Sequence, residues 1–270
     1  MKTQTTEKKS ARPRPIPDGL VVLTFDDGCK SDAEFVAPLL KEFGFGATFF
    51  VNNPSGTPEG WNARNAKNYA AWDQIAGMHK AGFEIGNHTV HHPNVSAMSK
   101  QAVIEELNAV EYLCAEHGIS RPVSFCFPGF SFGRNAIEAL KEKGYSFARR
   151  GAFPECRYDD KGQRGPVYDP HVNHPLLIPT TGFSGPHWGL DDLLWTISQA
   201  RDGKIAVLCF HGVPDVEHAW VHTDPQAFKE YMQHLRERDC TVIAMRDLAK
   251  YIDILAAPND PLMTKERVNP

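Results

Sequence analysis

Several features are missing from this sequence of 270 residues, and each absence excludes a class of protein. There is no long apolar run, which argues against a membrane span, and residues 1–17 are polar, basic and proline-rich, unlike a secretory signal. There is no basic block, since 29 basic and 33 acidic residues are mixed along the chain, which argues against nucleic acid as a partner. There is no CxxC pair among the six cysteines, which argues against a zinc ribbon or a dense disulfide framework.

What the sequence does contain is typical of a folded domain with a sizeable core. Hydrophobic residues make up 41% and aromatic residues 10% of the chain. We expect a flexible leader over residues 1–17, one folded domain over residues 18–256 and a C-terminal tail over residues 257–270. The lack of a signal-like segment favours a cytoplasmic location, and nothing in the sequence indicates the oligomeric state.

Short apolar runs alternate with amphipathic stretches, a pattern typical of βα units. The expected strands are 20–25, 47–51, 83–85, 123–127, 145–148, 205–210 and 241–244, and the expected helices are 33–43, 69–81, 100–117, 135–143, 190–200, 225–238 and 245–254. Ser99 is a plausible N-cap and Gly118 a stop for the third helix. Residues 151–186 lack a period and are expected to form long loops with one strand at 176–178. These repeats predict a single barrel-like α/β domain.

Polar residues follow several of these expected strands. Asp26 and Asp27 come directly after the first, His88 follows the third, and His211 follows the strand at 205–210. In α/β barrels the active site lies at the carboxyl ends of the strands. We therefore expect these carboxylates and imidazoles, which are far apart in the chain, to gather on one face.

The histidines His88 and His92 are four residues apart and would face the same way on a helical turn. Two imidazoles and one carboxylate make a three-ligand set that leaves positions open for water and substrate. One of the adjacent aspartates could bind the metal while the other takes a proton as general base. Both reach one site only if the chain turns at Asp27-Gly28. The alternative is that Asp-Asp-Gly is an ordinary turn without further function.

Four segments in this order resemble the polysaccharide deacetylase family, also called the NodB-homology or carbohydrate esterase 4 group. They are TFDDG (24–28), NHTVHH (87–92), FCFPGF (125–130) and VLCFHG (207–212). The resemblance implies a distorted (β/α)7 barrel. It also implies a metal-dependent hydrolase that removes acetyl groups from an N-acetylated carbohydrate or, less strongly, an O-acetylated one.

The resemblance also implies roles for single residues. Asp26 would be the general base toward a metal-bound water, and His211 the general acid. Asp27, His88 and His92 would hold a divalent metal, usually Zn²⁺ and sometimes Co²⁺ or another ion. The expected substrate contacts are Gly129 through its backbone N–H, Phe130, Leu208 as a wall of the acetyl pocket, and Trp188, whose indole could stack on a sugar ring.

One departure from the family pattern concerns the base. The third motif of the family usually carries an arginine that pairs with the base aspartate, and Cys126 stands at that position here. Arg149 or Arg150, at the end of the next strand, could supply the charge instead. Two other functions stay open: a cyclic amide hydrolase of the allantoinase-like branch, and a non-catalytic carbohydrate-binding barrel.

Overall fold

A computed structural model describes residues 13–53, 67–157, 162–257 and 262, and its centre is a curved sheet. The strands are β1 (Leu20–Phe25), β2 (Thr48–Val51), β3 (Glu84–Asn87), β4 (Ser124–Cys126), β5 (Phe147–Arg149), β6 (Gln163–Arg164), β7 (Gly182–Phe183), β8 (Ala206–Phe210) and β9 (Thr241–Ile243). The α-helices are α1 (Ala37–Phe43), α2 (Trp72–Lys80), α3 (Lys100–Glu116), α4 (Arg134–Glu142), α5 (Leu190–Ser198) and α6 (Pro225–Glu237).

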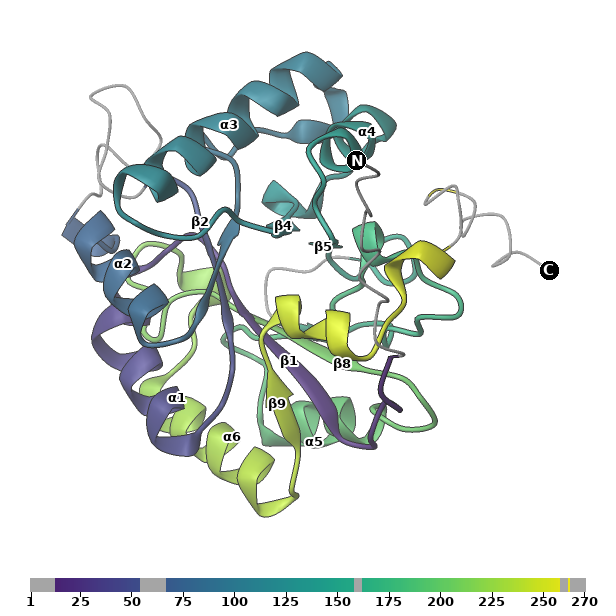
Figure 1. Ribbon diagram of the computed structural model, residues 1–270. Helices are drawn as coiled ribbons and strands as arrows, with labels where there is room; N and C mark the ends of the chain where they lie inside the picture. The colour runs from purple at the N-terminus through teal and green to yellow at the C-terminus, as the bar shows by residue number, and fades with distance from the viewer. Residues whose placement is uncertain (1–12, 54–66, 158–161, 258–261, 263–270) are drawn as a thin grey trace, which may run out of the picture.

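The sheet has the order β5-β4-β3-β2-β1-β8-β7-β6, and β9 also pairs with β1. The pairings are parallel except that of β6 with β7. Strand β1 lies in the middle and meets β8 along most of its length, β9 near its start and β2 near its end. Helices surround this curved sheet on its outside (Figure 1). The expected α/β fold with one distorted barrel is confirmed.

Alternate residues of the central strands face two different layers of the core. Leu23 and Phe25 of β1 belong to the cluster between the sheet and the outer helices, which includes Leu40 and Phe228. Val22 belongs to the cluster inside the barrel. Because the side chains of a strand alternate, the position of a residue along β1 or β8 decides whether it can reach the barrel interior.

The helix and strand predictions are confirmed for the long elements, and two of the weaker ones are wrong. Residues 175–177 form a 3₁₀ turn rather than a strand, with a single bridge between Arg149 and Ile178. The expected helix 245–254 consists of a 3₁₀ segment, η7 (Met245–Lys250), and a short turn at Ile254–Ala256. Met245 and Leu248 of η7 are buried in the interior cluster, so this segment closes one end of the barrel.

Residues on both sides of the expected domain contact the barrel. The backbone N–H of Arg14 donates to the carbonyl of Lys250, and Ile16 packs against the interior cluster. Residues 13–17 of the expected leader are therefore attached to the barrel, and residues 1–12 lie outside the described residues. Of the expected tail, Leu262 packs against the cluster under α3 and α4. Among the described residues, no helix has the length and apolar character needed to cross a membrane.

Candidate active site

A tight turn at the end of β1 brings both aspartates to the barrel mouth. Asp27 and Gly28 have positive φ angles of 75° and 65°, so the chain reverses as expected at this pair. The backbone N–H of Asp26 still donates to Phe210 of β8, at 3.0 Å, which holds the turn against the sheet. Both carboxylates are buried, with 1% exposure for Asp26 and 5% for Asp27. Buried carboxylates need hydrogen bonds or a cation to offset the loss of water.

The loop after β3 places the two histidines, and it is not the helical turn expected from their spacing. Thr89 and His92 have positive φ angles of 62° and 55°, so the chain loops back. The Asn87 side chain accepts from the N–H of Thr89, and the Thr89 hydroxyl accepts from the N–H of His92. Glu106 of α3 accepts from the N–H groups of Val90 and His91. Side chains of the loop and of α3 therefore fix the positions of the two imidazoles.

The predicted metal ligands meet at spacings that fit a tetrahedral cation. Oδ1 of Asp27 lies 3.4 Å from Nε2 of His88 and 3.5 Å from Nε2 of His92. Two ligand atoms that are each about 2.1 Å from a tetrahedral ion lie roughly 3.4 Å apart. The three ligand atoms all lie within 4.8 Å of one another. This set can therefore hold a divalent ion and leave further coordination positions open.

The hydrogen bonding of these residues also fits a cation. Nδ1 of His88 lies 2.9 Å from the carbonyl oxygen of Cys126, which can only accept, so Nδ1 carries the hydrogen. In the neutral imidazole Nε2 is then an acceptor that faces the carboxylate of Asp27. Oδ1 of Asp27 is buried and has no hydrogen-bond partner among the described residues. Two acceptors that face each other in a buried place require either a proton on Nε2 or a cation between them.

The surroundings shift the pKa values of Asp27 and His92, but not that of His88, in the direction that metal binding needs. Burial raises the pKa of Asp27. The facing imidazoles of His88, His92 and His211 together lower it by a larger amount, so the pKa of Asp27 lies below its ordinary value. Burial lowers the pKa of His92 to about 4, against the opposing effect of Asp27. Burial also lowers the pKa of His88, but the carboxylates of Asp27 and Asp26 raise it above its ordinary value.

Asp26 lies beside this set and is held by an arginine from another strand. Nη2 of Arg149, the last residue of β5, donates to both carboxylate oxygens of Asp26, and Nη1 donates to the hydroxyl of Thr180. Burial raises the pKa of Asp26, but the charge and hydrogen bonds of Arg149, together with the imidazoles of His88 and His211, more than offset this, so the net pKa is lowered. The hypothesis of a replacement arginine is confirmed for the contact of Arg149 with Asp26. Arg150 instead pairs with Glu155.

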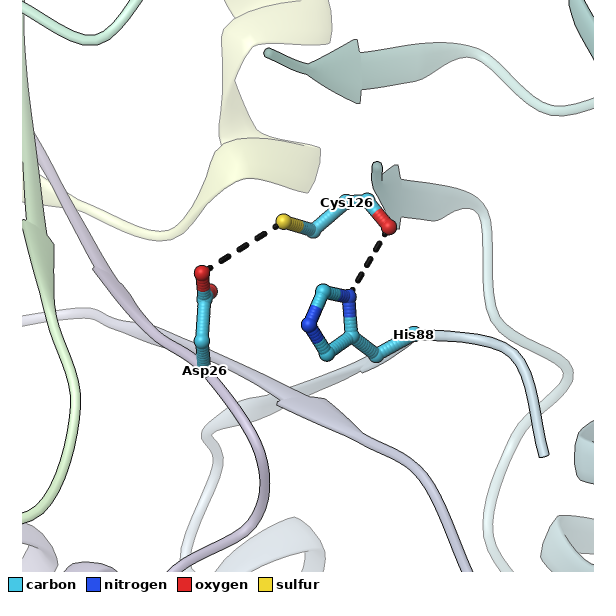
Figure 2. Close-up of side chains that lie close together, drawn as sticks. All are labelled: Asp26, His88 and Cys126. Atoms are coloured by element: carbon cyan, nitrogen blue, oxygen red, sulfur yellow. Dashed lines mark hydrogen bonds between the residues drawn. The ribbon is translucent and has the colours of Figure 1, made fainter. Parts of the chain in front are cut away.

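Cys126, at the sequence position where the family usually has an arginine, also contacts Asp26. Its Sγ lies 3.5 Å from Oδ2 of Asp26, and its carbonyl accepts from His88 (Figure 2). Burial raises the pKa of this thiol, which therefore stays an S–H donor. Asp26, His88 and Cys126 are also close enough to hold a metal ion. However, Nη2 of Arg149 lies 2.8 Å from the sulfur, and this positive charge disfavours a cation at that place.

One cavity of about 170 Å³ joins the predicted catalytic groups. Its lining includes Asp26, Asp27, His88, His92, Gly129, Phe130 and His211. Nε2 of His211 lies 4.0 Å from Oδ2 of Asp26 and 3.8 Å from Oδ2 of Asp27, while its buried Nδ1 has no hydrogen-bond partner among the described residues. The ring of Phe130 also packs over the guanidinium of Arg149, at 5.4 Å. The structure thus brings seven of the nine predicted site residues to one place.

The other two predicted substrate contacts, Leu208 and Trp188, do not line the cavity, so the role predicted for each of them is wrong. Leu208 is fully buried in the cluster between sheet and helices, because strand alternation turns it away from the barrel interior. Its neighbour Cys209 faces inward instead, with Sγ 3.6 Å from Oδ2 of Asp26. Trp188 is only 5% exposed and packs edge-on against Phe210 and Tyr231. It anchors the loop to the core and cannot stack on a sugar.

Cys209, which lies beside Asp26, and His218 and Trp220, which line the cavity, were not assigned a role from the sequence. Cys209 lies inside the barrel beside Asp26, and the alternation of β8 about Leu208 was the signal that could have found it. His218 and Trp220 line the cavity from the segment that follows β8. The nearness of His218 and Trp220 to His211 in the sequence could have indicated that they lie at the site. Side chains in a surface loop are more often exposed to solvent, however.

Fold and site together define a class of protein. It is a curved α/β barrel in which two histidines and one carboxylate that could hold a metal ion lie beside a buried aspartate at the carboxyl ends of the strands. A family model described as polysaccharide deacetylase matches residues 14–148, half of the chain. This chain therefore belongs to the polysaccharide deacetylase family.

Relatives with curated names agree with this assignment. The chain is 30% identical over 133 residues to a chitin deacetylase of Arthroderma benhamiae. The aligned region covers 47% of this chain and 32% of that protein. The chain is 34% identical over 93 residues to a chitin deacetylase of Colletotrichum lindemuthianum, which covers 34% of this chain and 35% of that protein. The match thus spans about a third of the length of each relative.

Solved structures show the same fold. The chitin deacetylase structure from Colletotrichum lindemuthianum has a TM-score of 0.58 at 18% identity and covers 91% of this chain and 93% of that one. A protein described as a CE4 family pseudoenzyme, from Bacillus anthracis, has a TM-score of 0.56 at 14% identity and covers 88% of this chain and 68% of that one. Likeness of fold therefore does not by itself decide between an active enzyme and an inactive relative.

Proposed function

We propose that this protein is a metal-dependent hydrolase that removes acetyl groups from an N-acetylated carbohydrate, with O-acetylated carbohydrates as the second substrate class. The observation that carries the proposal is the cavity in which the set Asp27, His88 and His92 faces Asp26 and His211. Membership of the polysaccharide deacetylase family and relatives named chitin deacetylase support the same activity. Two imidazoles and one carboxylate are typical ligands of catalytic Zn²⁺, and Co²⁺ accepts a similar set.

A divalent cation held by Asp27, His88 and His92 would polarise the acyl carbonyl and make water more acidic. Asp26 then accepts the proton of the attacking water, and Arg149 keeps this carboxylate ionised and oriented. The backbone N–H of Gly129 is proposed to donate to the carbonyl oxygen as negative charge develops on it.

His211 is proposed to complete the reaction as general acid. Its Nε2 faces the same cavity as Asp26 and lies 4.0 Å from Oδ2 of that residue. It gives a proton to the leaving nitrogen of an amide, or to the leaving oxygen of an ester, as the bond to the acyl carbon breaks. Asp26 returns its own proton to water once acetate has left.

The two alternative functions, a non-catalytic carbohydrate-binding barrel and a cyclic amide hydrolase, can be compared with the geometry of the site. A non-catalytic barrel would not need an ionised base, yet Arg149 is positioned to keep Asp26 ionised. A cyclic amide hydrolase would use the same residues on another substrate, so the site favours neither it nor a deacetylase. The sequence family and the named relatives favour the deacetylase.

The decisive measurement is acetate release from N-acetylated chito-oligosaccharides, O-acetylated xylan and a cyclic ureide, with and without chelator and added Zn²⁺. We expect acetate from at least one sugar substrate, loss of the activity with chelator and recovery with Zn²⁺. The variant Asp26→Asn, with its metal content measured, serves as the matched control and should be inactive. Metal-loaded protein that releases no acetate from any sugar would exclude the proposed function.

A further inference from the structure

The cavity has a second wall that the proposed chemistry does not use. It is formed by the segment after β8, from which His218, Trp220 and Val221 line the cavity. Val221 is 2% exposed and packs with Phe183 and Cys209, so the base of this wall is fixed to the core. Trp220 is 49% exposed, so the outer part of the wall presents an indole to solvent. A large apolar side chain at the mouth of a polar cavity suggests a ligand contact.

The imidazole of His218 is held in a defined orientation by a buried carboxylate. Asp215 is 6% exposed and accepts backbone N–H groups from Gly212, Glu217 and His218. Its Oδ2 lies 3.4 Å from Nδ1 of His218. This pairing raises the pKa of His218, while the negative charges of Asp27 and Glu217 act in the same direction. The other ring nitrogen, Nε2, lies on the side of the ring away from Asp215.

Size and chemistry together indicate what this wall contacts. The cavity of about 170 Å³ is smaller than the roughly 300 Å³ at which ordinary ligand pockets begin, so it holds an acyl group and the atoms next to it. The remainder of a larger substrate must then lie at the mouth, against Trp220. The centroids of the His218 and Trp220 rings are 5.2 Å apart, which places a hydrogen-bonding imidazole nitrogen beside an apolar face. A pyranose ring offers the matching pair, an apolar C–H face and hydroxyl groups at its edge.

We propose that His218 and Trp220 bind the sugar ring that bears the acetyl group. Trp220 stacks on the C–H face of that ring, Nε2 of His218 forms a hydrogen bond with one of its hydroxyl groups, and Asp215 is the positioning residue for His218. This inference rests on the proposed function and deepens it, because it names the side chains that select a sugar over other acetylated compounds. Stacking on a sugar ring, which we expected of Trp188 from the sequence, is thereby assigned to Trp220.

A second hollow adjoins the catalytic cavity and offers a competing place for the sugar. It has a volume of about 320 Å³, shares Gly129 and Phe130 with the catalytic cavity, and ends at Phe153, which is 53% exposed. Among the described residues, its lining holds three phenylalanines and two serines but no charged side chain, whereas the wall of Trp220 has an imidazole held by a buried carboxylate. For this reason we favour the wall of Trp220.

The test uses the full chain loaded with Zn²⁺ and measures kcat and KM for acetate release from fully N-acetylated chitotetraose and acetylated xylan. The variants Trp220→Ala and His218→Ala are expected to raise KM by about fivefold to tenfold, a loss of ~1–1.4 kcal/mol in binding, with kcat within about twofold. Trp220→Phe should recover most of the loss. Phe153→Ala and Tyr112→Ala, which also remove exposed aromatic rings, should leave KM unchanged, and thermal unfolding checks that each variant is folded.

Two results would overturn the inference while leaving the proposed function in place. One is acetate release with an unchanged KM in both Trp220→Ala and His218→Ala. The other is a raised KM in Phe153→Ala alone, which would indicate that the sugar binds in the second hollow. Failure of the wild-type chain to release acetate from either substrate is a separate outcome, because it overturns the proposed function itself and the inference with it.

Discussion

Replacement of Arg149 by methionine tests the link between the base and its unusual partner. Arg149 is fully buried and Asp26 is 1% exposed, so solvent hardly screens the pair. Arg149→Met removes the charge and the donors but keeps an apolar chain of similar reach. Removal of one member of a buried ion pair costs about 3–5 kcal/mol, because the other charge is left without compensation. The free energy of unfolding should fall by this amount.

The expected effect is large enough to measure by two methods. A loss of 3–5 kcal/mol corresponds to a fall of roughly 6–20 °C in the melting temperature of a domain of this size. Denaturant unfolding followed by circular dichroism should give the same loss, and acetate release should disappear, because burial then favours the neutral form of Asp26. Both measurements are made in chelator and again with Zn²⁺, so that metal loss is not mistaken for the effect of the pair.

A double-variant cycle separates the charge effect from damage to packing. Arg149→Met combined with Asp26→Asn removes both charges, and we expect it to regain most of the lost stability while staying inactive. Arg150→Met is the matched control, because its partner Glu155 is partly exposed and can be solvated when left alone. The reasoning is refuted if Arg149→Met loses less than about 1 kcal/mol and keeps its activity, or if the double variant is no more stable than the single one.

Three further predictions follow from the same structure. Asp27→Ala should lose bound Zn²⁺ while Asp26→Asn keeps it, as metal analysis after dialysis would show, and the opposite pattern would reverse the two roles. Trp188→Ala should destabilise the fold by about 3–5 kcal/mol with an unchanged KM at low temperature, and a raised KM in folded protein would restore its role as a sugar contact. Gly86→Ala should cost roughly 1–3 kcal/mol in denaturant unfolding, because its Cβ would meet the ring of Phe50. Gly77→Ala, whose Cβ meets nothing within 4 Å in the middle of α2, should be neutral or stabilising, and equal losses in both would contradict the steric reason.

The ligand set of the candidate site could be predicted because its residues are adjacent to strand ends. Asp26 and Asp27 follow β1 directly, and His88 follows β3, so the parallel topology alone brings them to one edge. We expected His92 to face the same way as His88 on a helical turn, and this was wrong, because the segment is a loop with positive φ angles. The histidine nevertheless reaches Asp27, because Asn87 and Glu106 hold the loop in place.

The errors concern side chains whose direction depends on the packing of several elements. Leu208 and Cys209 are neighbours in β8, and the pleat of the strand sends one to the helices and the other to Asp26. Trp188 and Trp220 are both loop tryptophans, and only contacts with Phe210 and Tyr231 make the first a core residue. Local sequence does not encode such distant neighbours.

By itself the sequence determined the order of βα units, the two aspartates at the end of the first strand and the histidines that can share a cation with one of them. These features depend on periodicity and on residues close together in the chain. Only the tertiary structure decided that Arg149, from β5, compensates Asp26 at the end of β1, and that His218 and Trp220 form the open wall of the cavity. The reason is physical: a buried charge takes its partner from whichever strand the barrel brings within hydrogen-bond distance, however far that strand lies along the chain.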